Sequence, residues 1–525
     1  MGTRQTSASL DPLKLNLFAD AVLERCSRKR LGLKATLAAF LPAVAGKLGA
    51  DAAALETVNE DLKKEVFHWR SAPAFRLEKT PAKAAARASR GLRWVSRPLD
   101  VSGRRVGTIA FGYRLAAEFD GPYLECLNAV CEEIDGVLAS IQTAAVKQKL
   151  LERVTRCLTR SVLREAIDEA VGALRAEIPF RRLGMVYLNE DAAEGSRIQY
   201  RVYRGDRCVH DSELRPHKAL SRAIRRLGVR LLDPDRHIVR QTLGLREGMD
   251  FILSAQIAGA GRLGKLVIEV DGGLSTFGRD LIRVFANSVS QRLIDYNRER
   301  RHLAKFFPAP VVSELLSSPD YMERHLSPRV KPVAILYADI NSFTKLCEKG
   351  LLRPDRIGDF VDFWSEGVVR IVWEHGGVFD KMVGDCVIAH FGPPFFRKSR
   401  AAIARDAVLA AGEIQVFTAG LERLSRYRGL AARAKVKGLG VAAGVNLCSA
   451  AVGLFGPNHD FTIFSSGMNQ TARLQSQAGF RETFVMASAR DEMRRAGLAG
   501  GLRFEGPFEA EVKNVARPLR YFRLK

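Results

Sequence analysis

Two acidic residues, Asp339 and Asp385, stand where a carboxylate is able to bind a divalent cation. Asp339 follows the apolar run 333–338, a pattern that predicts a buried strand with an acid at its end. Asp385 follows Gly384 between two apolar runs, which predicts a β-hairpin with the acid in its turn. Taken singly, each acid is explained equally well as a helix cap or a turn residue. As a pair at two strand ends, they suit Mg²⁺ or Mn²⁺, because hard cations take oxygen ligands and leave positions for substrate phosphates.

Three segments around these acids form a specific pattern: YADINSFTKL at 337–346, HGGVFDKMVGD at 375–385 and DFTIFSSGMNQTARL at 460–474. In order and spacing they resemble the signature segments of class III nucleotidyl cyclases. The resemblance runs from about residue 306 to the C-terminus. It implies a ferredoxin-like βαββαβ catalytic domain at residues 329–525, with two metal ions at each active site.

The resemblance also implies a role for each matching residue. The metal site is assigned to Asp339, Ile340 and Asp385, and the catalytic pair is Asn469 and Arg473. The residues assigned to substrate binding are Lys381, Thr462, Phe343 and Lys513. Lys513 matches a lysine that contacts the terminal phosphates, although a lysine near a chain end fits simple solvation equally well.

These residue types suit the cyclisation of ATP. The ribose 3′-hydroxyl must attack the α-phosphate in line and expel pyrophosphate, so catalysis depends on positioning and charge neutralisation. Arg473 offers planar donors to the α-phosphate, and Asn469 lies four residues earlier on the same helical face. Lys381 is able to donate to N1 of adenine, whereas N1 of guanine carries a proton. The sequence therefore predicts an adenylate cyclase, a lyase that makes 3′,5′-cyclic AMP.

Three departures from the family pattern keep alternatives open. Ser342, Cys448 and Ser465 occupy positions where the family usually has Gly, a residue that often marks a positive φ or a close approach. These three replacements cast doubt on the rate of catalysis more than on the class of protein. The alternatives are a guanylate cyclase, disfavoured by Lys381 and Thr462, and a non-catalytic cyclase-like scaffold, disfavoured by the complete set of site residues.

Bulk composition describes an ordinary globular protein with an unusual charge. The chain has 525 residues, enough for about three domains, with 47% hydrophobic and 27% charged residues. A net charge of +24 favours anionic partners, yet the basic residues are spread widely and accompany no nucleic-acid module. We therefore expect no specific nucleic-acid partner, and docking on an acidic membrane is left open.

The 8 scattered cysteines indicate reduced thiols and a cytoplasmic protein. The most apolar segment, 438–456, is predicted to be a buried strand pair.

The N-terminal half reads as two similar units of helix, strands and helix after a tail at 1–15. Residues 16–145 and 146–295 both resemble GAF domains, small antiparallel sheets flanked by helices, and the second is the better match. The signature of cyclic-nucleotide-binding members is not intact in either unit. We expect these units to dimerise, with or without an unidentified small-molecule ligand.

A linker at 296–328 joins this half to the cyclase-like domain. A seam of mostly apolar positions, spaced alternately by four and three, runs from the preceding helix into this linker. Its members are Ile282, Ala286, Val289, Leu293, Tyr296, Arg300, Leu303 and Phe307. Up to Val289 this seam fits packing on the adjacent sheet; beyond Leu293 it predicts a parallel coiled coil. In the family the active sites form between two catalytic domains, so the resemblance implies a homodimer with two equivalent sites. The fold class expected is thus a multidomain α+β and α/β protein with a coiled-coil linker.

Overall fold

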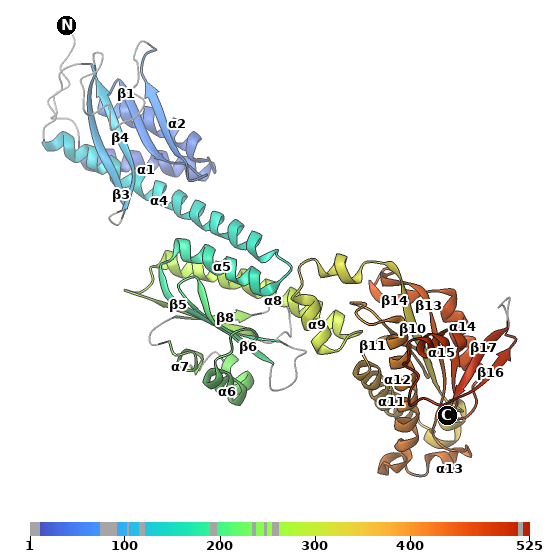
Figure 1. Ribbon diagram of the computed structural model, residues 1–525. Coiled ribbons are helices and arrows are strands. Elements are labelled where there is room, and N and C mark those ends of the chain that lie inside the picture. The colour runs from blue at the N-terminus through green and yellow to red at the C-terminus, as the bar shows by residue number, and fades with distance from the viewer. Residues whose placement is uncertain are drawn as a thin grey trace, which may run out of the picture. The chain divides into compact units, whose positions relative to one another are not determined.

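The computed structural model describes residues 11–73, 92–101, 104–114, 121–189, 197–233, 238–245, 249–254, 262–512 and 518–525. It is a mixed α+β structure with three separate sheets (Figure 1). Contacts within the chain divide it into two compact units, and the second contains all of 289–525. Within the described residues, no helix combines the length and the apolar character that crossing a bilayer requires.

In its described residues, the N-terminal part comprises a four-stranded sheet with strand order β2-β1-β4-β3 and three helices. Its elements are α1 (Pro12–Arg28), α2 (Leu33–Leu48), β1 (Ala52–Val58), β2 (Lys64–Arg70), β3 (Arg93–Val101), β4 (Arg104–Tyr113) and α4 (Gly121–Leu158). Helix α2 ends before Gly49, whose φ of 68° makes it a left-handed C-cap. Helix α4 continues without a break through the boundary expected at 145, so a helix and not a loop leads out of this part.

The middle part is a five-stranded sheet with order β7-β6-β5-β9-β8. Its elements are α5 (Leu163–Glu177), β5 (Phe180–Leu188), β6 (Ile198–Arg204), β7 (Arg207–Asp211), α6 (Lys218–Leu227), α7 (Ile238–Thr242), β8 (Met249–Ser254), β9 (Arg262–Val270) and α8 (Thr276–Ala304). Both N-terminal sheets thus pair the first strand of the unit with its last described strand, which agrees with the expected repeat. That these are GAF domains stays a prediction.

The C-terminal part contains the longest sheet, with order β11-β12-β10-β13-β15-β17-β16 and β14 paired to β13. The strands are β10 (Arg329–Ile340), β11 (Gly377–Val383), β12 (Cys386–Phe391), β13 (Val441–Phe455), β14 (Asp460–Phe464), β15 (Thr483–Met486), β16 (Phe504–Ala510) and β17 (Leu519–Leu524). The helices are α9 (Ala309–Leu316), α10 (Phe343–Lys345), α11 (Pro354–Glu374), α12 (Arg400–Gly420), α13 (Leu430–Ala434), α14 (Ser466–Gln477) and α15 (Ala487–Arg495).

The order β10-α11-β11-β12-α12-β13 with antiparallel pairs β10–β12, β10–β13 and β11–β12 is the βαββαβ arrangement expected from the sequence. The apolar run of β10 does not alternate with polar residues because both faces of the strand are buried. Ala334 and Leu336 pack into a core with α11 and α12, whereas Val333 and Ile335 pack on the opposite face with α9. Asp339 continues the second set, so it projects from the face opposite α11 and α12.

Two expectations need revision or remain open. Residues 438–456 were expected to form a strand pair, but 441–455 form one strand, β13, because 441–452 pair continuously with β10 along 12 residues. The coiled coil is not confirmed. Leu293, Leu303 and Phe307 are each only 1% exposed within the single chain, so the periodic seam is already buried there.

Candidate active site

The two acids predicted to bind metal lie together at the end of the C-terminal sheet. Asp339 is the partner of Cys386 in the β10–β12 ladder, which places it beside Asp385 in the turn before β12. Gly384 takes the left-handed conformation, with φ of 63°, that a two-residue hairpin turn requires. Burial and the neighbouring Asp385 charge raise the pKa of Asp339 to about 6. Burial also raises the pKa of Asp385, while hydrogen bonding to the main chain of Ile340 opposes that rise.

The donor set fits a divalent cation that also binds the substrate. Two half-buried carboxylates in mutual repulsion are stabilised by a positive ion between them. Across the part of the chain that the structure describes, no group of three or more His, Cys, Asp or Glu side chains is arranged to hold a metal by itself. An ion at Asp339 and Asp385 would therefore complete its coordination with other oxygens, such as those of phosphates.

Gln475 is a site residue that the sequence did not reveal. It is buried on the inner face of α14, and its side-chain amide lies near enough to Asp339 to lower the pKa of that acid against the effect of burial. Its Nε2 also donates to the carbonyl oxygen of Ala442 at 3.4 Å. The available signal was helical spacing, since Thr471 and Gln475 are four residues apart and share the buried face of the helix.

Lys381 and Thr462, the residues predicted to contact the purine base (the base-reading residues), lie on two strands in contact, β11 and β14. Lys381 is exposed, and its Nζ lies 3.7 Å from an oxygen of Asp380. Thr462 is 6% exposed, and its hydroxyl has no hydrogen-bond partner. Asp380 also carries no hydrogen bond on either carboxylate oxygen, although its side chain is completely buried. The sequence analysis did not identify Asp380.

The remaining predicted residues lie apart from the carboxylate pair. Asn469 and Arg473 are exposed on α14, and among the described residues neither is hydrogen-bonded or ion-paired to Asp339 or Asp385. Phe343 is partly buried against the sheet core, directly after the acid-bearing strand. Lys513 lies outside the described residues.

The three positions where glycine was expected differ in strain. Ser342 takes a φ of 56°, the left-handed conformation that glycine adopts at no cost. Ser465 has a φ of −164°, an extended conformation open to any residue, and its hydroxyl accepts from the Gly467 amide at 3.1 Å as the N-cap of α14. Cys448 pairs with Val333 in the regular β10–β13 ladder. Backbone strain is thus confined to Ser342 among these three.

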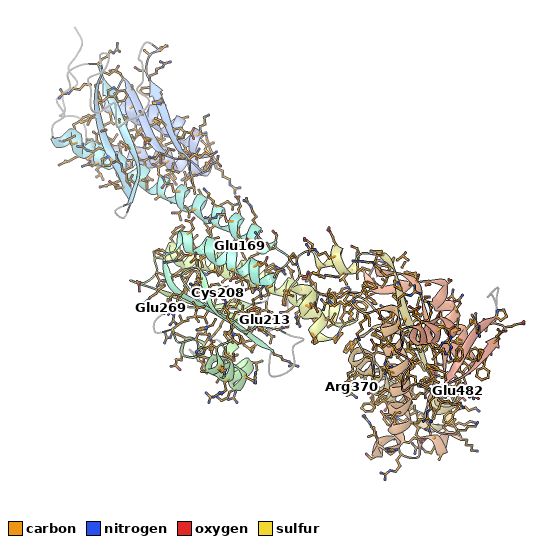
Figure 2. All side chains as sticks on the ribbon, viewed as in Figure 1. Glu169, Cys208, Glu213, Glu269, Arg370 and Glu482 are labelled. Carbon is orange, nitrogen blue, oxygen red and sulfur yellow. The ribbon has the colours of Figure 1, made fainter. Side chains whose placement is uncertain are left out.

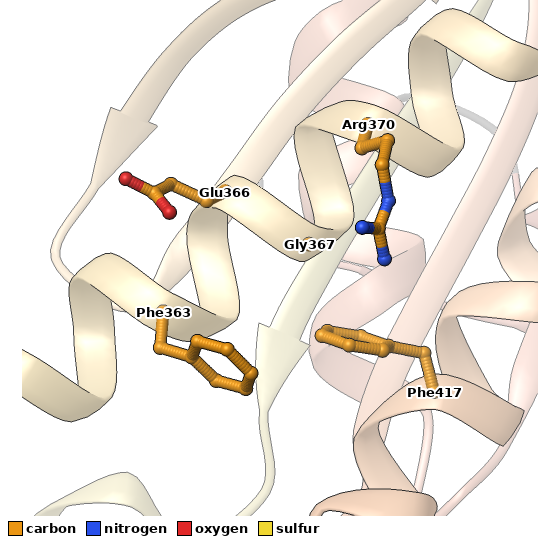
Figure 3. Close-up of a pocket in the computed structure, with 5 residues that line it drawn as sticks. All are labelled: Phe363, Glu366, Gly367, Arg370 and Phe417. Carbon is orange, nitrogen blue, oxygen red and sulfur yellow. The ribbon is translucent and has the colours of Figure 1, made fainter.

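A cavity of about 270 Å³ lies elsewhere in the C-terminal part, between α11 and α12 (Figure 3). The residues that line it are Phe363, Glu366, Gly367, Arg370 and Phe417. The Phe417 ring and the Arg370 guanidinium lie close together there, whereas the Glu366 carboxylate points away. None of the predicted site residues lines this cavity.

The middle part has an apolar cluster beside its sheet. Apolar side chains from the sheet and from α6 and α7, including Tyr200, Leu220, Val239 and Val267, form one packed cluster. Cys208, on β7 (Figure 2), donates to the carbonyl oxygen of His210 at 3.4 Å. Burial raises the pKa of the Cys208 thiol, which disfavours the reactive thiolate.

Comparison with known proteins gives matches among solved structures only. No family model and no curated protein matches the chain. The adenylyl cyclase CyaB from P. aeruginosa is 24% identical, over 38% of this chain and 96% of that one, with a TM-score of 0.34. The guanylyl cyclase Cya2 is 21% identical, over 38% and 93%, with a TM-score of 0.32. A bacterial light-regulated adenylyl cyclase is 15% identical, over 65% and 92%, with a TM-score of 0.37. The solved structures that resemble part of this chain thus include both adenylyl and guanylyl cyclases.

Proposed function

We propose that the chain is an adenylate cyclase of class III, which converts ATP into 3′,5′-cyclic AMP and pyrophosphate. The observation that carries this proposal is the meeting of Asp339 and Asp385 at one end of a βαββαβ sheet. Three signature segments that agree in order and spacing with that class place these acids in its metal site.

The proposed chemistry assigns each residue a task. Asp339, Ile340 and Asp385 would hold Mg²⁺ or Mn²⁺, two ions per site, which would supply positive charge for the triphosphate and lower the pKa of the 3′-hydroxyl. Gln475, whose amide acts on the pKa of Asp339, would orient that side chain. Arg473 donates to the α-phosphate as negative charge develops, and Asn469 orients the ribose. Phe343 and Lys513 complete the substrate site.

The placement of the catalytic pair supports a homodimer. Asn469 and Arg473 are exposed on α14, and among the described residues neither is hydrogen-bonded or ion-paired to the two carboxylates. A second copy would bring its Asn469 and Arg473 to Asp339 and Asp385, so that two equivalent sites form across one interface. We further propose that the GAF-like parts regulate turnover by changing how these two halves meet, with or without a small ligand.

Turnover by the full-length chain tests this function. Purified protein is supplied with ATP or GTP, with Mn²⁺ or Mg²⁺, beside an Asp385→Asn variant that keeps the size of the side chain but loses its charge. Cyclic AMP from ATP that falls at least a hundredfold in the variant supports the proposal. Cyclic GMP as the main product would favour a guanylate cyclase. No product from a folded dimer that still binds nucleotide would favour the non-catalytic scaffold.

A further inference from the structure

Asp380 is a buried acid whose carboxylate makes no hydrogen bond and whose ion-pair partner is the exposed Lys381. Its side chain is 0% exposed, and neither carboxylate oxygen makes a hydrogen bond. A carboxylate in such surroundings is costly unless another group compensates it, and burial raises its pKa to about 6. Besides burial, the groups that act on its pKa are Thr462 and Lys381, which belong to the proposed base-reading site, and Asp460, whose charge raises it.

An irregularity in β11 places Asp380 beside Lys381. Phe379 pairs with Ala389 and Lys381 pairs with Ile388, so Asp380 is an extra residue in the ladder with β12. In a regular strand, neighbours such as Asp380 and Lys381 would point to opposite faces. The bulge turns the acid so that one oxygen lies 3.7 Å from the Lys381 Nζ.

Thr462 supplies the complementary group on β14. Its buried hydroxyl has no hydrogen-bond partner, and its interaction with Asp380 lowers the pKa of the acid against the effect of burial. An ionised carboxylate only accepts hydrogen bonds, whereas a hydroxyl has one proton and two lone pairs. Donation of the Thr462 hydroxyl to ionised Asp380, which a small side-chain shift would allow, leaves the Thr462 oxygen as an acceptor toward a bound base.

We propose that Asp380 is a positioning residue that makes Lys381 and Thr462 selective for adenine. This inference rests on the proposed function and deepens it. Adenine presents an acceptor at N1 and an amino donor at position 6, which match the Lys381 donor and the Thr462 acceptor. Guanine presents a donor at N1 and an acceptor at position 6, so both contacts would be repulsive.

An Asp380→Asn variant of the full-length protein tests the role. The amide of Asn is able to donate to Thr462, which frees the hydroxyl proton to bond the guanine oxygen. The ratio of kcat/KM for ATP to that for GTP should fall about tenfold. An Asp362→Asn variant, at an exposed position on α11, should leave the ratio unchanged. A purely structural role would slow both nucleotides alike, so an unchanged ratio in Asp380→Asn overturns the proposal.

A second measurement needs no change at Asp380. Purine riboside triphosphate lacks the 6-amino group but keeps the N1 acceptor, so it isolates the Thr462 contact. The wild-type chain should use it about fivefold less well than ATP, and a Thr462→Val variant should use the two equally. Turnover of both by the wild type without discrimination refutes this inference alone. Absence of turnover with every nucleotide refutes the proposed function, and the inference with it.

Discussion

The ring of Phe307 lies 4.9 Å from the ring of Phe461, measured between centroids. Phe307 follows the end of α8, and Phe461 directly precedes Thr462 on β14. The carbonyl oxygen of the adjacent Phe306 accepts a hydrogen bond from the Phe379 amide on β11 at 3.3 Å. The segment after α8 therefore contacts both strands that carry the proposed base-reading residues.

This contact predicts that Phe307→Ala weakens substrate binding as well as stability. Phe307 is 1% exposed, so its truncation should cost about 3 kcal/mol and loosen β14. We expect KM for ATP to rise several-fold in a variant that remains folded at 20 °C. Thermal unfolding and turnover measure the two effects. Phe464→Ala, on the same strand but with its side chain 56% exposed, serves as the control that should change neither. An unaltered KM in Phe307→Ala would show that the two segments are not coupled.

The meeting of Asp339 and Asp385 was predictable because its signals are local. An apolar run that ends in an acid indicates the end of a strand, whatever the rest of the chain does. In the same way, a Gly-Asp pair between two apolar runs indicates a hairpin. Asp380 and Gln475 were not predictable in the same way. The bulge that turns Asp380 depends on the register between β11 and β12, and the contact of Gln475 depends on how α14 packs.

The heptad seam shows the limit of periodicity. The spacing of Leu293 and Leu303 correctly indicated a buried helix face, because any partner buries the same face. It did not indicate whether that partner is a second copy or the same chain. In the structure both residues are buried within one chain.

Ser342→Gly should stabilise the protein. The serine holds a φ of 56°, which costs a residue with a Cβ about 1 kcal/mol relative to glycine. We expect the C-terminal part to unfold about 3 °C higher in a thermal scan. Ser465→Gly is the matched comparison, because its backbone is extended and its hydroxyl caps α14, so stability should not rise there. Equal shifts in the two variants would contradict the assignment of strain to Ser342.

Mixing two inactive variants tests the shared site. Asp385→Asn and Arg473→Ala homodimers should both be inactive, since every site lacks one essential group. A heterodimer would contain one site with both defects and one with neither. After exchange of subunits, activity should return to about a quarter of the wild-type value, because half of the dimers are mixed and each has one intact site. Continued inactivity in a mixture shown to contain heterodimers would place each site within one chain.

His390 should make the C-terminal part sensitive to acid. The side chain is 0% exposed, neither ring nitrogen has a hydrogen-bond partner, and burial, followed by the nearby Lys381 charge, lowers its pKa to about 3. Between about pH 6.5 and pH 3 the unfolded chain therefore binds a proton at this residue that the folded chain does not. The contribution of His390 to stability is complete above pH 6.5 and is lost as the pH falls through this window.

A His390→Leu variant isolates this effect, because it removes the titrating ring and keeps an apolar side chain among apolar neighbours. The pKa values of Asp339 and Asp380 are raised, so their contributions to the stability of the folded state increase as the pH falls. Both residues are present in both proteins, so these contributions cancel in the comparison. The wild type should lose about 1.4 kcal/mol more than the variant for each pH unit between 6 and 4. Chemical denaturation at a series of pH values measures this difference. Parallel pH dependence in the two proteins would mean that His390 gains a proton in the folded state as readily as in the unfolded one.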